Sequence, residues 1–257
     1  MLTFRNTNIF FICLLLVLIV EHIKLGLPVY VYPLLFVVYS LIVFYGCINV
    51  GTNFFIKIVC SAETDRKEIA ISFDDGPAQN YTPEILQILE QENIKATFFC
   101  IGNRIAGNED LLRRLVQEGH TIGNHSYSHH FWFDMFSAKK MLADLKQMDD
   151  EMVRATGLRP KLFRPPYGVT NPNLKNAIIN GAYTPVGWSV RSMDTVTKDE
   201  KKLLDKITGA IAPGAVFLFH DTMEITAKLL PRFIEEVKKK GYQIVPLHKL
   251  LHLQPYA

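Results

Sequence analysis

The stretch Glu68-Ile-Ala-Ile-Ser-Phe-Asp-Asp-Gly-Pro77 is an apolar, β-branched run that ends in two adjacent carboxylates and a turn. Such a run is typical of a buried strand, and Gly76-Pro77 ends it. Asp74 and Asp75 are therefore predicted to lie at the C-terminal end of a strand, where α/β proteins bind ligands. Because two buried carboxylates repel each other, the pair requires a cation or open solvent. Taken alone, the same residues also fit an ordinary Asp-Asp-Gly turn.

From residue 68 onward, strand-like and helical segments alternate. The pattern predicts strands at 68–73, 96–101, 121–123, 161–163, 185–188, 215–219 and 242–245. It predicts helices at 83–91, 109–118, 137–156, 172–180, 198–211 and 225–240, with Thr82 as one N-cap and Thr197-Lys-Asp-Glu200 as a capping box. This alternation predicts an α/β fold with a parallel sheet, either doubly wound or rolled into a (β/α) barrel, and the barrel is preferred.

The N-terminal region is far more apolar than the rest of the chain. Its segment Leu27–Val50 has 24 residues, or about 36 Å as a helix, against a bilayer core of about 30 Å. We expect a membrane region at residues 1–50 with two helices at about 6–24 and 27–50, a linker at 51–67 and one domain at 68–257. A cleaved signal peptide is the alternative for the first run, but no small-x-small cleavage site follows Val20. The Lys and Arg residues flank both runs on all sides, so they do not decide the orientation.

The composition excludes several classes of protein. A formal charge of +3 without a dense Lys/Arg run argues against a nucleic-acid partner. The chain has no GxGxxG and no GxxxxGK[ST] motif, which argues against a nucleotide cofactor. Its four cysteines are far apart and include no CxxC pair, so neither a disulfide framework nor a thiolate zinc site is indicated.

The stretch His125-Ser-Tyr-Ser-His129 follows another short strand and places two imidazoles four residues apart. On a helical turn they would share one face and could hold one metal ion, although a lone HxxxH also fits a polar surface turn. Two imidazoles and one carboxylate form a common catalytic zinc set with an open position for water. If Asp74 or Asp75 is the third ligand, the other is free to act as a base.

Three further polar groups follow predicted strands. Arg164, in Phe163-Arg-Pro-Pro-Tyr-Gly168, is held in a rigid turn from which it can pair with a catalytic carboxylate, while a backbone N–H of that turn can donate to an oxyanion. His220 suits a general acid, and Asp194 can adjust its pKa. The alternatives are a structural turn with a surface arginine and a core histidine.

These motifs, in this order, resemble those of the polysaccharide deacetylase family (carbohydrate esterase family 4, the NodB-homology domain), over about residues 67–251. The resemblance implies a distorted (β/α)7-type barrel and metal-dependent removal of N-acetyl groups, or occasionally O-acetyl groups, from sugars. It implies one divalent metal ion, zinc in the first instance, and a glycan substrate. For a membrane-anchored envelope enzyme of a bacterium, it places the catalytic domain outside the cytoplasm.

The resemblance also assigns roles by position. Asp74 matches the catalytic base, and Asp75, His125 and His129 match the metal ligands. Arg164 matches the arginine that holds the base, His220 the general acid and Asp194 the carboxylate that tunes it. Tyr167, Leu218 and Trp188 match residues that contact the substrate or the oxyanion.

The fourth motif departs from the family pattern, in which many members have Asp-x-x-Asp-Trp. Here the segment is Arg191-Ser-Met-Asp194-Thr195, which lacks the first carboxylate and the aromatic residue. The resemblance therefore does not extend to the residues expected to contact the sugar at these two positions. A hydrolase of O-acetyl sugars or small non-sugar amides, and an inactive glycan-binding domain, remain as alternatives.

Overall fold

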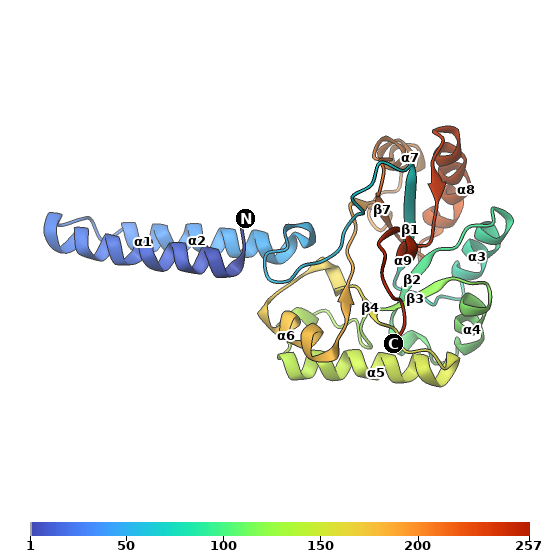
Figure 1. The fold of residues 1–257 in the computed structure, drawn as a ribbon, viewed down its shortest axis with the longest axis horizontal. Coiled ribbons are helices and arrows are strands. Elements are labelled where there is room, and N and C mark those ends of the chain that lie inside the picture. The colour runs from blue at the N-terminus through green and yellow to red at the C-terminus, as the bar shows by residue number, and fades with distance from the viewer. Residues whose placement is uncertain (1) are drawn as a thin grey trace.

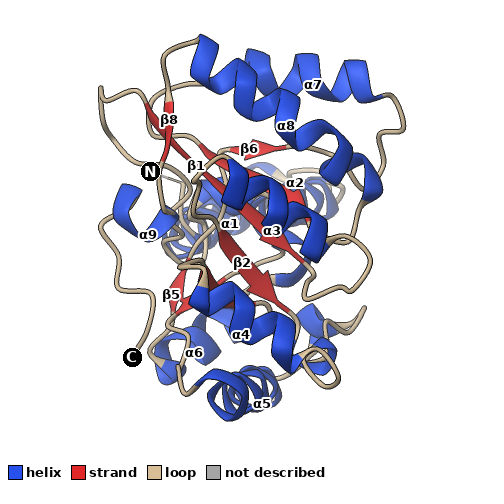
Figure 2. Cartoon of the chain, turned by 90° about the vertical axis from the view of Figure 1, so that its right-hand side faces the viewer, coloured by secondary structure: helices blue, strands red, loops and turns tan. Residues whose placement is uncertain are grey.

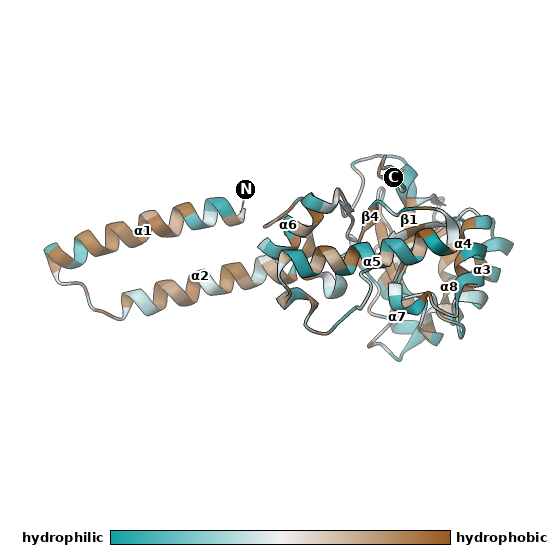
Figure 3. Cartoon of the chain, turned by 90° about the horizontal axis from the view of Figure 1, so that it is seen from below, coloured by the Kyte–Doolittle hydropathy of each residue, from teal (hydrophilic) through white to brown (hydrophobic). Residues whose placement is uncertain are grey.

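A helical hairpin precedes the main domain in the computed structural model, which describes residues 2–257. Helices α1 (Phe4–Leu25) and α2 (Val31–Ile48) are joined by a short loop and lie side by side, projecting from the domain as an arm (Figure 1). Apolar residues cover both helices along most of their length (Figure 3). Both are long and apolar enough to cross a membrane. The short 3₁₀ helix η1 (Val50–Thr52) follows α2.

The domain is built on a parallel sheet with the strand order β5-β4-β3-β2-β1-β7-β6, and β8 also pairs with β1. The strands are β1 (Glu68–Asp74), β2 (Thr97–Cys100), β3 (Thr121–Asn124), β4 (Leu162–Phe163), β5 (Thr184–Pro185), β6 (Val190–Arg191), β7 (Val216–His220) and β8 (Gln243–Ile244). The order leaves β5 and β6 at the two edges, so the sheet is an open half-barrel. The predicted α/β barrel-type fold is confirmed, in an incomplete form.

Helices cover the outside of this sheet. They are α3 (Thr82–Gln91), α4 (Glu109–Gln117), α5 (Ala138–Thr156), α6 (Pro172–Gly181), α7 (Glu200–Gly209) and α8 (Glu224–Lys239), whereas the short α9 (Leu247–Leu250) packs against Ala70 on the other face. Helices α3, α4 and α8 lie in front of β1 and β2 in Figure 2, while α5 and α6 lie at the bottom. The short helices η2 (Gly102–Arg104), η3 (Phe133–Met135) and η4 (Pro166–Gly168) follow strand ends.

The alternating faces of β1 explain how the sheet carries a site. Ile69, Ile71 and Phe73 are fully buried in the core beneath the outer helices. Ala70 packs in a smaller core with residues of α9. Because successive side chains of a strand point to opposite faces, Ser72 and Asp74 share the inner face with Ala70. The strand thus places a carboxylate inside the half-barrel without breaking its apolar outer face.

Residues 58–62 form bridges next to β5 and β7. Val59 forms a parallel bridge with Val186 beyond β5, and Ser61 forms an antiparallel bridge with Ala215 before β7. The N–H of Gly187 donates to the Val59 carbonyl at 2.9 Å. The segment between the hairpin and β1 therefore covers part of the open side of the half-barrel.

Two local predictions were wrong, and one strand was missed. Thr82 is the first residue of α3 rather than its cap, and its hydroxyl is engaged elsewhere. Helix α7 is capped by Asp199, whose side chain accepts from the Lys202 N–H, so Thr197 forms no capping box. Strand β6 (Val190–Arg191) was not predicted: it follows the predicted strand 185–188 within two residues.

Candidate functional site

The register of the sheet brings the predicted residues together. Asp74 of β1 lies opposite His220 of β7. In the same way Cys100 pairs with Asn124, and Asn124 pairs with Phe163. Because the paired strands end at the same level, the residues that follow, Asp75, His125 and Arg164, meet at one edge. The sequence spacing alone does not reveal this alignment.

Asp75, His125 and His129 form a cluster that fits a metal ion. Their ligand atoms lie within 4.8 Å of one another. Nε2 of His125 is 3.6 Å and Nε2 of His129 is 3.4 Å from Asp75 Oδ1. The Nδ1 of His125 lies 2.9 Å from the Arg164 carbonyl, which can only accept, so the proton sits on Nδ1 and Nε2 keeps its lone pair toward the cluster. Two imidazoles and a carboxylate suit zinc and leave a coordination position open.

The protonation of His129 also suits a ligand. Burial, and next the neighbouring His125, lower the pKa of this imidazole to about 4. The neutral imidazole is the form that binds a metal. The donor set thus fits a divalent cation in its geometry, and His129 also fits it in its protonation state.

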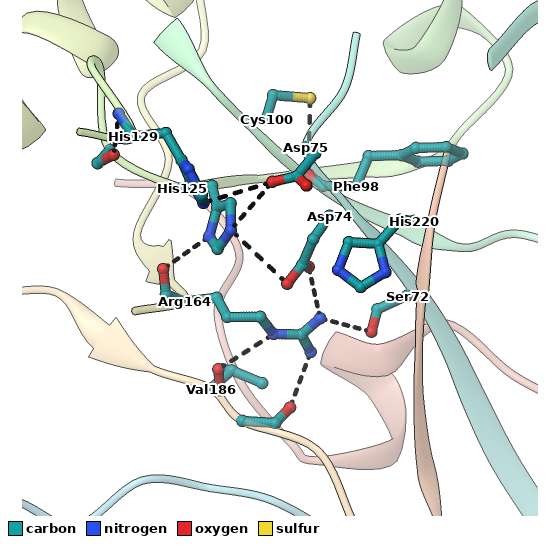
Figure 4. A network of polar contacts seen from close by, with 12 residues as sticks. Ser72, Asp74, Asp75, Phe98, Cys100, His125, His129, Arg164, Val186 and His220 are labelled. Carbon is teal, nitrogen blue, oxygen red and sulfur yellow. Dashed lines mark hydrogen bonds and ion pairs between the residues drawn. The ribbon is translucent and has the colours of Figure 1, made fainter. Parts of the chain in front are cut away.

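Asp74 is tied to Arg164 rather than to the cluster. Arg164 Nη1 donates to Asp74 Oδ1 at 2.7 Å and to the Ser72 hydroxyl at 2.8 Å (Figure 4). Its other nitrogens donate to the carbonyls of Val186 and Gly187. The guanidinium is fully buried, and a buried charge requires such complete pairing. The second oxygen of Asp74 lies 3.8 Å from His125 Nε2, so it faces the edge of the cluster.

His220 and Asp194 form a second buried pair. The Nδ1 of His220 is 2.8 Å from Asp194 Oδ1, and Asp194 Oδ2 accepts from the His220 N–H and from the Thr226 hydroxyl. Burial alone would lower the pKa of His220, but the hydrogen bond and charge of Asp194 outweigh it and raise this pKa. Burial would likewise raise the pKa of Asp194, yet the bonds from His220 bring it below its ordinary value. The imidazole is thereby favoured in its protonated form.

A cavity of about 210 Å³ opens above these groups. Tyr167, Leu218 and Trp188 line it together with the metal cluster, Asp74 and His220, as do Arg191 and Thr195 of the divergent fourth motif. The Tyr167 ring lies 4.7 Å from the His129 ring, and its hydroxyl donates to the His129 carbonyl at 3.3 Å. The cavity brings every predicted site residue except the fully enclosed Arg164 and Asp194 to one surface.

The His125–His129 segment is a loop and not a helical turn, so that part of the prediction was wrong. Its Ser126 and His129 have φ values of 67° and 42°, and Asp75 and Tyr167 are also left-handed, with φ values of 77° and 59°. Non-glycine residues in this region each cost of order 1–3 kcal/mol, and such strain gathers at functional sites. The two imidazoles therefore meet through loop curvature rather than through helical periodicity.

The sequence motifs assigned no role to Asp221. Its side chain is fully buried beside Gly76, and its Oδ2 accepts from the Thr82 hydroxyl at 2.7 Å. Its N–H donates to the Asp74 carbonyl, and burial raises the pKa of its carboxyl to about 7. Asp221 therefore supports the loop after β1 from behind. Its only signal in the sequence is its place next to His220; Thr226 had none.

Comparison with known proteins identifies the family. The polysaccharide deacetylase profile matches residues 61–186. A peptidoglycan-N-acetylglucosamine deacetylase of Bacillus cereus is 34% identical over 199 residues, covering 73% of this chain and 89% of that protein. The fold and the site thus define an α/β half-barrel with a His/His/Asp cluster. The chain belongs to the polysaccharide deacetylase family.

Two further relatives extend the comparison. The peptidoglycan-N-acetylglucosamine deacetylase PgdA of Listeria monocytogenes is 32% identical over 184 residues, which are 72% of this chain but only 39% of that protein. The chain thus spans about two fifths of this longer relative. A crystal structure of a peptidoglycan N-acetylglucosamine deacetylase superposes with a TM-score of 0.73 at 30% identity, covering 78% of this chain and 95% of the other.

Proposed function

We propose that the protein is a metal-dependent hydrolase that removes N-acetyl groups from glycans containing N-acetylglucosamine. The observation that carries this proposal is the position of Asp74, which is held by Arg164 beside the Asp75/His125/His129 cluster and opposite His220. The relatives named as peptidoglycan deacetylases support the substrate class.

Each side chain of the site has a separate role in the proposed hydrolysis. A divalent metal held by Asp75, His125 and His129 would act as a Lewis acid and lower the pKa of a water molecule, and zinc suits the donor set. Asp74, which accepts a hydrogen bond from Arg164, takes a proton from the water whose oxygen attacks the acetamide carbon. The backbone N–H of Tyr167 donates to the developing oxyanion. Protonated His220 then gives a proton to the sugar nitrogen as the C–N bond breaks, which releases acetate and a free amine.

Leu218 and Trp188 are proposed to hold the acetyl group and the sugar. Both line the cavity, and Trp188 lies under Arg191, whose guanidinium is 5.9 Å from its ring. Because Arg191 and Thr195 replace the usual residues of the fourth motif, a second candidate is an O-acetyl sugar or a small amide in place of an N-acetylated polymer.

We also propose that α1 and α2 anchor the enzyme in a membrane. Their 22 and 18 residues give about 33 and 27 Å, which matches a bilayer core of about 30 Å. Since peptidoglycan lies outside the cytoplasm, the catalytic domain is expected on that side.

Acetate release tests the function. The purified full chain with zinc is offered peptidoglycan, chitooligosaccharides, acetylated xylan and a small acetamide, and acetate is measured with and without a chelator. Release from the N-acetylated glycans that stops with the chelator and returns with zinc supports the proposal. Release from xylan or the small amide alone would favour the second candidate, and no release from any substrate would indicate a binding domain.

A further inference from the structure

An exposed apolar loop lies beside the cavity. Phe131, Trp132 and Met135 are 69%, 58% and 72% exposed, whereas Phe133 of the same loop is buried. We call residues 130–136 the aromatic loop. Large apolar side chains that gather on a surface mark an interaction site, and this loop presents three within five residues.

The aromatic loop is tied to the end of the proposed membrane anchor. The Thr170 N–H donates to the Cys47 carbonyl at 2.9 Å, and the Thr170 hydroxyl donates to the Gly46 carbonyl at 3.3 Å. The next residue, Asn171, donates from its side chain to the Asp134 carbonyl at 2.7 Å. One short chain of hydrogen bonds therefore runs from the last turn of α2 to the aromatic loop.

The length of α2 determines how deep in the membrane these hydrogen bonds at its C-terminal end lie. Its 18 residues extend about 27 Å, slightly less than the bilayer core, so its last turn must lie at the membrane surface. Tyr30 and Tyr45 lie near its two ends and are exposed, as in the aromatic belts of membrane helices. Thr170, bonded to Gly46 and Cys47, is then at the level of the lipid headgroups. Figure 1 shows α6, which begins two residues later, on the side of the domain that faces the hairpin.

The charges near the loop suit the same surface. Helix α5 starts directly after it with exposed Lys139 and Lys140 and has no acidic residue in its first turn. Cations at a helix N-terminus oppose the helix dipole, so they do not serve the helix itself. The Lys140 ammonium lies 3.6 Å from the centre of the Phe136 ring. Lysines next to exposed aromatic rings fit anionic headgroups above an apolar layer.

We propose that the aromatic loop docks into the headgroup layer of the membrane that holds α1 and α2. Phe131 connects the loop to the site, because its ring lies 6.5 Å from that of Tyr167, which lines the cavity. Docking therefore sets one rim of the catalytic cavity on the bilayer, and the enzyme acts on glycan at the membrane surface. This inference rests on the proposed membrane anchor.

Tryptophan fluorescence tests the docking. The chain has two tryptophans, so the difference between the wild type and Trp132→Phe reports Trp132 while Trp188 stays in place. The full chain is reconstituted in vesicles of phosphatidylcholine and phosphatidylglycerol, with lipids brominated near the headgroup end of the acyl chain. Trp132 should be quenched several-fold more by these lipids than by aqueous iodide. Quenching by iodide alone would overturn the proposal.

A tryptophan elsewhere on the domain provides the control. Val153 is exposed on α5, and it lies 15 residues, or about 22 Å, along the helix from Ala138. Val153→Trp in the Trp132→Phe background should be quenched by iodide and not by the lipids. Protein that fails to float with the vesicles would contradict the anchor itself. Protection of Trp132 by chitooligosaccharides in detergent would identify a sugar subsite and overturn docking.

Discussion

Asp74 and Asp75 are neighbours in the sequence but face different partners. Asp74 is the last residue of β1, and its side chain lies inside the half-barrel against Arg164. Asp75 has left the strand with a φ of 77°, which turns its carboxylate toward the two imidazoles. The repulsion of two carboxylates is thus relieved separately, by a guanidinium on one side and a cation site on the other.

The charge of Asp194 sets the pH range of the proposed acid. Because Asp194 raises the pKa of His220, activity should persist above pH 6.5 and fall as the imidazole loses its proton. Asp74 and Asp75 also favour the protonated form, but they contribute less than Asp194. Asp194→Asn should therefore move the alkaline limb of the kcat profile to lower pH and reduce kcat at pH 8. Thr226→Val should move it less, since it removes one hydrogen bond and no charge. An unshifted limb in Asp194→Asn would show that another group is titrating.

At the scale of elements, the site is made by the segments that follow the strands. The strand β1 and the order of the motifs could be predicted, because an apolar, β-branched run and the polar residues that follow it are local features of the sequence. The left-handed residues 126, 129 and 167 could not, because some of their contacts come from other parts of the chain. The Gly102 N–H donates to the Ser126 carbonyl, and the Tyr167 hydroxyl donates to the His129 carbonyl. For the same reason the helical reading of His125–His129 was wrong and the role of Asp221 was not visible.

Gly168 tests how closely the turn after β4 is fitted to the cavity. Its φ is +71°, and an added Cβ would lie 2.6 Å from Cη2 of Trp188. Gly168→Ala should displace the Trp188 ring, raise KM severalfold and cost about 1 kcal/mol or more of stability, because alanine is strained at positive φ. Acetate-release kinetics and thermal unfolding measure both effects.

The control is Gly209→Ala at the end of α7, where an added Cβ meets nothing within 4 Å. This change should leave KM unaltered and keep or slightly raise the melting temperature, since alanine favours helix. Equal changes in KM and melting temperature in the two variants would contradict a close contact between Gly168 and Trp188.

At the scale of the whole molecule, the hairpin relates the N-terminus to the catalytic domain. Helices α1 and α2 are joined by a short loop and lie side by side, so both ends of the hairpin lie on the domain side (Figure 1). The N–H of Phe4 donates to the Phe54 carbonyl at 2.9 Å, which ties the first turn of α1 to the segment after α2. The sequence predicted two apolar helices but not this junction, because the hydrogen bond joins residues that are far apart in the sequence.

This topology predicts which positions share a compartment. In a background without native cysteines, Leu2→Cys and Val29→Cys each offer an exposed thiol, at the start of α1 and in the hairpin loop. On intact cells an impermeant maleimide should label Leu2→Cys, as it does a cysteine placed at exposed Val196 of the domain. Val29→Cys should react only after the membrane is opened. Labelling of Val29→Cys alone would reverse the orientation, and labelling of all three would contradict a spanning hairpin.

The division of labour between Asp74 and Asp75 is tested most directly by measuring zinc content and acetate release on the same samples of wild type, Asp74→Asn and Asp75→Asn. Asp74→Asn should keep zinc at the wild-type ratio while acetate release falls by roughly 10²–10⁴-fold, the usual contribution of a general base. Asp75→Asn should lose both zinc and acetate release. Loss of zinc in Asp74→Asn with retention in Asp75→Asn, or undiminished acetate release from Asp74→Asn, would contradict the assignment.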